Sequence, residues 1–155
     1  MAVYQTRAEV ASQGDIFPAV PLRIPLEGLQ GALKYDGEAI VVSHDCDCDK
    51  ATGRAPGADP DSVLVTVAPV HLLTALSGGL PGDVRDGRVY RYFYLPPEGG
   101  YPEKCVDFAL LQPMPVGTLT GRTRSASLSD DFRGRMQLHL RTLIERPPPP
   151  EGALP

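Results

Sequence analysis

The chain has 155 residues, of which 42% are hydrophobic and 22% charged, with three cysteines and a formal net charge of −4. This length suits one domain with its own core, the cysteines argue against a secreted disulfide framework, and the negative charge excludes a general attraction to nucleic acid. No segment approaches the roughly 20 apolar residues of a membrane span, and the N-terminus lacks a signal-peptide core, so we expect a cytoplasmic protein without membrane contact.

Prolines and glycines divide the chain into short elements. With 17 prolines and 16 glycines, the composition argues against a helical bundle. Residues 1–13 are expected to form a loose N-terminal arm. Residues 16–26 are predicted as an irregular or edge strand, because their prolines remove backbone donors. Residues 28–37 are predicted as a loop, with its turn at residues 35–37.

Runs of apolar residues predict the further strands. Residues 39–42 form a β-branched run and residues 62–70 are apolar on both faces, so both are predicted as buried central strands. Residues 71–76 are predicted as one short helical turn. The remaining predicted strands span residues 88–95, 104–112 and 114–120.

The C-terminal segment predicts one helix, at residues 129–146. Ser129 is a favourable N-cap, and Asp130 and Asp131 place negative charge in the first turn, where the helix dipole favours it. Apolar side chains then recur at helical spacing, at Phe132, Met136, Leu140, Leu143 and Ile144. Residues 147–155 form a proline-rich tail. We therefore predict a mainly β fold, a small barrel closed by this helix, in a single domain at residues 14–146.

The order of these elements resembles the MazF/PemK-type toxins. The similar segments are Gly14-Asp15-Ile16-Phe17, Ala39-Ile40-Val41-Val42-Ser43, Ser62-Val63-Leu64-Val65 and the strand at residues 105–112 before the terminal helix. The resemblance implies an SH3-like barrel that pairs into a homodimer. It also implies a setting in a bacterial toxin–antitoxin, phage-related or defence system.

The sequence departs from that family at the catalytic positions. The active members of the MazF/PemK-type family are endoribonucleases. Their catalytic residues are an Arg in an Arg-Pro pair at the start of the second strand and a Thr at the end of the third. Gly37-Glu38 stands at the first of these positions, and Pro69 lies near the second. The resemblance therefore implies the scaffold without the ribonuclease activity.

A second resemblance is to an uncharacterised group of bacterial proteins that carry a Ser-Gln/His-x-Cys-Asp motif. It rests on the residues from Val41 to Asp47, on a later Leu-Pro and Val-Asp-Phe, and on residues 124–129 before the helix. This resemblance implies no activity.

A cluster of metal-binding residue types follows the strand at residues 39–42. If the strand continues, His44, Cys46 and Cys48 lie on one face and could bind Zn²⁺, with Cys105 or an aspartate as the fourth ligand. The alternative is a strand end with one buried cysteine and an acidic, solvated turn.

The same segment offers a catalytic alternative. His44, Asp45 and Asp47 could supply a base, an orienting carboxylate or a Mg²⁺ site for a nuclease. The neighbouring carboxylates raise the pKa of a cysteine and disfavour a thiolate nucleophile. His71 and His139 have no evident partners and are predicted to be structural.

Aromatic and basic side chains form two candidate binding surfaces. Tyr90, Tyr92 and Tyr94 share one face of a predicted strand, where they could anchor a protein partner or stack on bases, or simply fill the core. Arg122 and Arg124 open a basic C-terminal third that could bind nucleic acid or an acidic partner, or could pair with neighbouring acids.

We therefore predict a non-catalytic binding or accessory module with a protein partner. The alternatives are a nuclease that uses residues 44–49 and a small zinc-binding protein.

The zinc alternative can be tested by elemental analysis of protein purified without chelator. A site at residues 44–48 predicts near-stoichiometric zinc in the wild type and its loss in Cys46→Ser, because thiolate ligands hold Zn²⁺ most strongly. A metal-free wild-type protein would eliminate this alternative.

Overall fold

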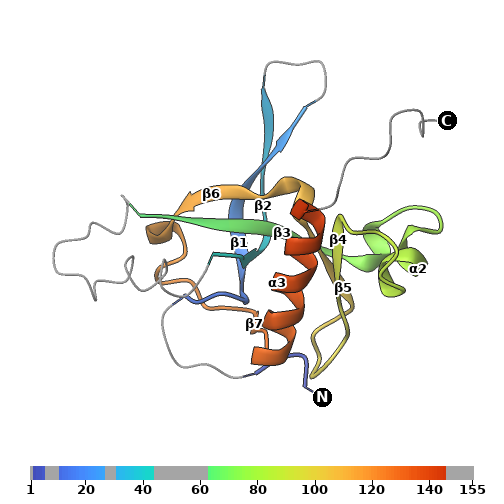
Figure 1. The fold of residues 1–155 in the computed structure, drawn as a ribbon. Helices are drawn as coiled ribbons and strands as arrows, with labels where there is room; N and C mark the ends of the chain where they lie inside the picture. Colours follow the sequence, from blue (N-terminus) through green and yellow to red (C-terminus); the bar gives the residue numbers. More distant parts are fainter. Residues whose placement is uncertain (1, 6–10, 27–30, 44–62, 146–155) are drawn as a thin grey trace.

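The computed structural model describes residues 2–5, 11–26, 31–43 and 63–145, and it shows a mainly β fold with a C-terminal helix, as predicted (Figure 1). Within these residues, seven strands form one sheet in the order β4-β5-β3-β2-β1-β7, with β6 paired to β3 and every pairing antiparallel. The strands are β1 (Asp15–Pro25), β2 (Ala32–Val41), β3 (Leu64–Leu72), β4 (Tyr92–Leu95), β5 (Lys104–Asp107), β6 (Gln112–Pro115) and β7 (Ala126–Ser127). The helices are α2 (Leu80–Arg85) and α3 (Asp130–Glu145), with 3-10 turns η1 (Leu73–Ala75), η2 (Phe108–Leu110) and η3 (Val116–Thr118). Among the described residues, no helix has the length and apolar character that crossing a membrane requires.

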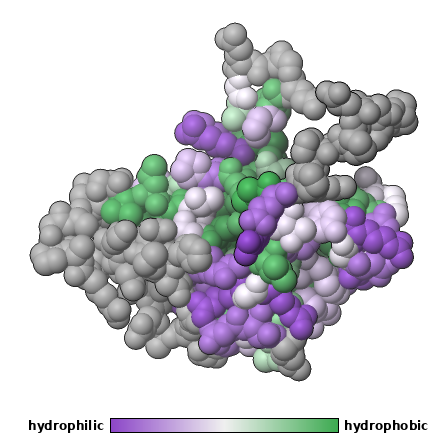
Figure 2. Space-filling model, viewed as in Figure 1, coloured by the Kyte–Doolittle hydropathy of each residue, from purple (hydrophilic) through white to green (hydrophobic). Residues whose placement is uncertain are grey.

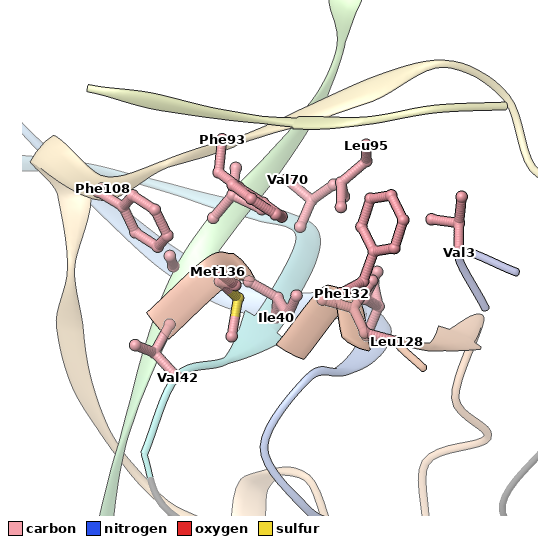
Figure 3. Packing of buried hydrophobic residues seen from close by; sticks show 13 residues of the cluster. Val3, Ile40, Val42, Val70, Phe93, Leu95, Phe108, Leu128, Phe132 and Met136 are labelled. Atoms are coloured by element: carbon pink, nitrogen blue, oxygen red, sulfur yellow. The ribbon is translucent and has the colours of Figure 1, made fainter. Parts of the chain in front are cut away.

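The main core lies between the sheet and α3, which crosses its face in Figure 1. Figure 3 shows Phe132 and Met136 of α3 beside Ile40 and Val70 of the two central strands. Both helix side chains are buried, and the Phe132 amide donates to the Ser129 hydroxyl over 3.4 Å. The predicted helix and its N-cap are therefore confirmed.

A second core lies on the opposite face of the sheet, between β1, β2, β3 and β6. Ile40 points toward α3, whereas Ala39 and Val41 belong to the second core. The alternation of a strand thus explains why the β-branched run is apolar at every position: it is buried on both faces. Residues 39–42 are central, as predicted.

The sheet curls so that β6 approaches β1, but no strand ladder joins these two in the described residues. The side chain of Gln112 bridges the gap instead: its Oε1 accepts from the Arg23 amide at 2.9 Å, and its Nε2 donates to the Arg23 carbonyl at 3.2 Å. The facing strands carry prolines at Pro21, Pro25, Pro113 and Pro115, which have no N–H to donate. The predicted closure into a barrel is therefore corrected to a curled, open sheet.

Several element boundaries differ from the prediction. Residues 35–37 lie inside β2 and pair with β1, so the turn predicted there was wrong. The strand predicted at residues 104–112 breaks after Asp107, whose carboxylate accepts from the Ala109 amide at 3.0 Å and caps η2. The helix α2 and the short strand β7 were not predicted.

Gly14 joins three parts of the fold. Its amide donates to the Val41 carbonyl at 2.9 Å, and its carbonyl accepts from the Leu128 amide at 3.0 Å. Its φ of 86° is in the left-handed region, and a Cβ on it would lie 2.7 Å from Cγ of Arg133. Both the conformation and the crowding therefore require glycine here.

Asp15, the next residue, is fully buried and holds the start of β1 to the segment before α3. Its carboxylate accepts from the Ser12 amide at 2.8 Å and from the Ser127 hydroxyl, and lies 3.1 Å from the Arg124 guanidinium. Moving any of these partners away would leave the buried negative charge of Asp15 uncompensated. The carboxylate therefore holds the surrounding segments in place.

Residues 2–5, which belong to the predicted loose arm, pack on the domain. Val3 is buried in the main core, and Tyr4 forms a β-bridge with Leu128. The Glu98 carboxylate accepts from the amides of Val3 at 2.8 Å and Tyr4 at 3.0 Å. Apolar and backbone groups thus anchor a segment that reads as polar.

Substitution of Gly14 tests how much its backbone conformation and its close packing contribute to stability. Gly14→Ala should lower the free energy of unfolding by about 2–3 kcal/mol, because it adds crowding against Arg133 to the cost of a left-handed alanine. Urea denaturation measures the loss.

Gly121 provides a matched control, since its φ is 80° and a Cβ on it would have no atom within 4 Å. Gly121→Ala should cost only about 1 kcal/mol, the backbone part alone. Equal losses in the two variants would mean that crowding at Gly14 has no role.

Candidate functional site

Most of the predicted metal and catalytic residues fall outside the described residues. His44, Asp45, Cys46, Asp47 and Cys48 all belong to this set, so the zinc and nuclease hypotheses stay predictions. In the part of the chain that the structure describes, no three His, Cys, Asp or Glu side chains come together as a metal site would require.

Cys105 is the one predicted metal ligand that the structure places. It is fully buried beside Leu73, Val84 and Tyr92. Burial, and then the charge of Asp107, raises the pKa of the thiol to about 11. The Cys105 thiol is therefore protonated at neutral pH.

The three tyrosines predicted to share a face do not stay together. Tyr92 is buried and Tyr94 donates to Glu103 at 2.7 Å, both on the side of β4 that faces away from α3. Tyr90 lies before the start of β4, next to His139 of α3, whose Nε2 is 2.8 Å from the Tyr90 carbonyl oxygen. The strand is too short to hold all three in one stripe.

The two arginines predicted to bind a partner are engaged within the fold. Arg122 donates to the carbonyls of Thr118 and Ala19, each at 2.7 Å, and Arg124 lies against Asp15. The helix arginines pair with acidic neighbours, in the pairs Arg133–Asp130, Arg135–Asp131 and Arg141–Glu145. The ion pairs weaken the case for a basic nucleic-acid surface here.

Glu38 and Pro69, which stand where the MazF/PemK-type resemblance would require catalytic residues, have structural roles. The Glu38 carboxylate accepts from the Tyr101 hydroxyl at 2.8 Å and pairs with Lys104. Pro69 is buried in β3 opposite Ala39.

A polar cluster that sequence reasoning missed lies where β4 meets β5. Arg91 makes two hydrogen bonds to the buried Asp107, at 2.9 and 2.8 Å. His71 of β3 pairs with Cys105 of β5, so its side chain lies on the same face of the sheet as Asp107. Burial lowers the pKa of His71, while the Asp107 charge raises it and the Arg91 charge lowers it. The only sequence signal was an Arg and an Asp sixteen positions apart, with nothing local to link them.

Among the described residues, a β ribbon offers an exposed surface for binding. β3 pairs with β2 only from Glu38 to Val41, so residues 32–37 continue paired to β1 alone. Figure 1 shows this β1–β2 ribbon projecting beyond the rest of the sheet. Figure 2 shows hydrophilic and hydrophobic residues side by side along it, and Leu33 is 52% exposed.

The β1 edge of the ribbon is closed to further strands. Pro21 and Pro25 lack N–H groups, and Gln112 binds both backbone groups of Arg23 between them. A groove of about 520 Å³ runs along this edge, lined in part by Arg23, Lys34 and Thr118. Arg23 and Lys34 are directly opposed across the ribbon, and no described residue forms an ion pair with either.

The β2 edge of the ribbon is open. Pro21 pairs with Asp36 and Pro25 with Ala32. Because proline cannot donate, these pairs, and Arg23 with Lys34 between them, are the pairs that exchange no hydrogen bonds. The amide and carbonyl of Ala32, Lys34 and Asp36 therefore point away from β1, and no described strand receives them. We call residues 32–37 the β2 open edge.

Comparison of the sequence with protein-family models found no matching family, and comparison with curated proteins found no match.

The lowered pKa of His71 predicts a dependence of stability on pH. The unfolded chain binds a proton on this residue near pH 6.5, before the folded chain does, so stability is complete above about pH 7 and falls as the pH is lowered through 6.5 toward the lower pKa of the folded chain. His71→Gln should remove most of this fall, measured by urea denaturation at each pH. An unchanged slope in the variant would assign the dependence to another group.

Proposed function

We propose that this chain is a non-catalytic binding module that docks an extended segment of a protein partner along the β2 open edge. The added segment would continue the ribbon as a third strand. Main-chain hydrogen bonds would supply affinity, and alternate side chains would supply selectivity.

The observation that carries this proposal is the difference between the two edges of one ribbon. The β1 edge is blocked by two prolines and by the Gln112 side chain. The β2 edge has neither, and its backbone groups at Lys34 and Asp36 meet no described partner. An exposed edge of this kind is a ready template for another strand.

Side chains on the open edge suit a protein partner. Leu33 and Tyr35 lie on one face of the ribbon and Lys34 and Asp36 on the other, because side chains alternate along a strand. A docked strand would thus meet apolar groups on one face and both signs of charge on the other.

The absence of catalysis in this proposal rests on the positions where the MazF/PemK-type resemblance would require it. Glu38 and Pro69 stand there, held in an ion pair and in a buried strand. Zinc binding and nuclease activity at residues 44–49 remain alternatives, each supported by the sequence alone. A setting in a toxin–antitoxin, phage-related or defence system is likewise supported only by the resemblance.

The test is a pair of variants at one position. Random peptides displayed on phage are selected on the wild-type protein, and a selected peptide is titrated by fluorescence polarisation. Lys34→Pro removes the outward N–H and should weaken binding about tenfold or more, whereas Lys34→Ala keeps that donor and should stay within about threefold. Pro21 and Pro25 occupy equivalent positions on β1, so the ribbon should accept the proline.

Circular dichroism of both variants checks that they fold. Binding that is equal in Lys34→Pro and the wild type would refute docking at this edge, as would the failure of the library to yield any peptide that binds.

A further inference from the structure

We propose that a second copy of this chain occupies the β2 open edge, so that two ribbons join about a twofold axis into one four-stranded antiparallel ribbon. This inference rests on the proposed function, because it uses the same edge, and it names the partner. The outward backbone groups of β2 and the charges beside them favour this pairing.

The outward backbone groups restrict the registers that a twofold pairing can adopt. Only Ala32, Lys34 and Asp36 present both an amide and a carbonyl to the open side, since Glu38 already pairs with Val70 of β3. In an antiparallel pairing, residues with outward groups must face one another to exchange hydrogen bonds. The registers that use these residues differ by steps of two positions.

Charge selects one of these registers. With the axis at Tyr35, Lys34 faces Asp36 of the second copy and Asp36 faces Lys34 of the second copy, which gives two opposite-charge pairs and two pairs that exchange hydrogen bonds. A shift of one step brings Lys34 opposite Lys34, and a shift the other way brings Asp36 opposite Asp36. Like charges directly opposed across strands are destabilising, so only the register centred on Tyr35 is complementary.

The other face of the ribbon fits the same register. Leu33 then lies opposite Gly37 of the second copy, which has no side chain to obstruct it. The Tyr35 ring already covers Gly37 so closely that a Cβ there would lie 2.6 Å from Cε2. The exposed Leu33 side chain would thus gain an aromatic surface to pack on.

The charges also account for selectivity. A lysine in an exposed strand edge normally opposes indiscriminate strand addition. Here Asp36, two positions away on the same face, makes the edge complementary to itself while the lysine still opposes other cationic segments. The contact between the two copies is short, and small interfaces of this kind are weak. We therefore expect a weak dimer whose population depends on protein concentration.

The test is a charge-reversal cycle, with association measured by sedimentation velocity over a concentration series. Lys34→Asp and Asp36→Lys should each weaken the dimer about tenfold or more, because each places like charges opposite one another twice. The double variant carrying both changes should restore association to within a few fold. An equimolar mixture of the two single variants should form a heterodimer.

The cycle contains its own controls. The two single variants change the net charge in opposite directions, so a general charge effect cannot weaken both. Restoration in the double variant shows that neither substitution unfolds the ribbon.

Three results would overturn the inference: a wild-type protein that stays monomeric, single variants that associate as well as the wild type, or a double variant that does not recover. The peptide titration separates this failure from that of the proposed function. If Lys34→Pro still loses peptide binding, the edge docks a different partner, and if it does not, both proposals fail.

Discussion

A proline in a strand has no N–H to offer a neighbour, and in this protein four such positions face one another across the gap between β1 and β6. Pro21 and Pro25 on one side and Pro113 and Pro115 on the other prevent the ladder that would close the sheet. Gln112 supplies one donor and one acceptor in its place. Of these prolines, Pro21 and Pro25 also set which groups of β2 point outward, because a pair that includes proline cannot exchange hydrogen bonds. Pro21 and Pro25 therefore contribute both to the open sheet and to the outward orientation of the β2 backbone groups.

The start of β1 is held by several contacts, whereas its other end belongs to the projecting ribbon. Gly14 and Asp15 connect the start of β1 with Val41, Ser127 and Arg124 through backbone bonds and a buried carboxylate. A bulge at Ala19, where φ is 51°, then redirects the strand toward the ribbon. Arg122 donates to the Ala19 carbonyl and holds the bulge in place. A rigid base of this kind presents the ribbon at a defined angle, which lowers the conformational cost of docking on it.

Local patterns predicted the parts of the fold that depend on local chemistry. The spacing of Phe132 and Met136 and the cap at Ser129 sufficed for α3, and the β-branched run around Ile40 sufficed for a central strand. The turn predicted at residues 35–37 was wrong, because Asp36-Gly37 has the composition of a turn while its conformation is set by pairing with distant β1. The roles of Arg91, Arg122 and Arg124 were also out of reach, since each depends on a carbonyl or carboxylate that the fold brings from elsewhere. The open edge itself follows only from register, which a single sequence does not reveal.

Self-pairing and partner binding would compete, because both use the outward groups of Lys34 and Asp36. By mass action, a weak dimer would cover this edge at high concentration and leave it free at low concentration. A partner strand would then have to bind more strongly than the second copy does, and it would have the same charge pattern to match: an acid opposite Lys34 and a base opposite Asp36. A segment with an acid and a base two positions apart meets this requirement, and β2 is itself such a segment. The charge pattern that makes the edge complementary to itself thus also specifies the chemistry of any partner that displaces the second copy.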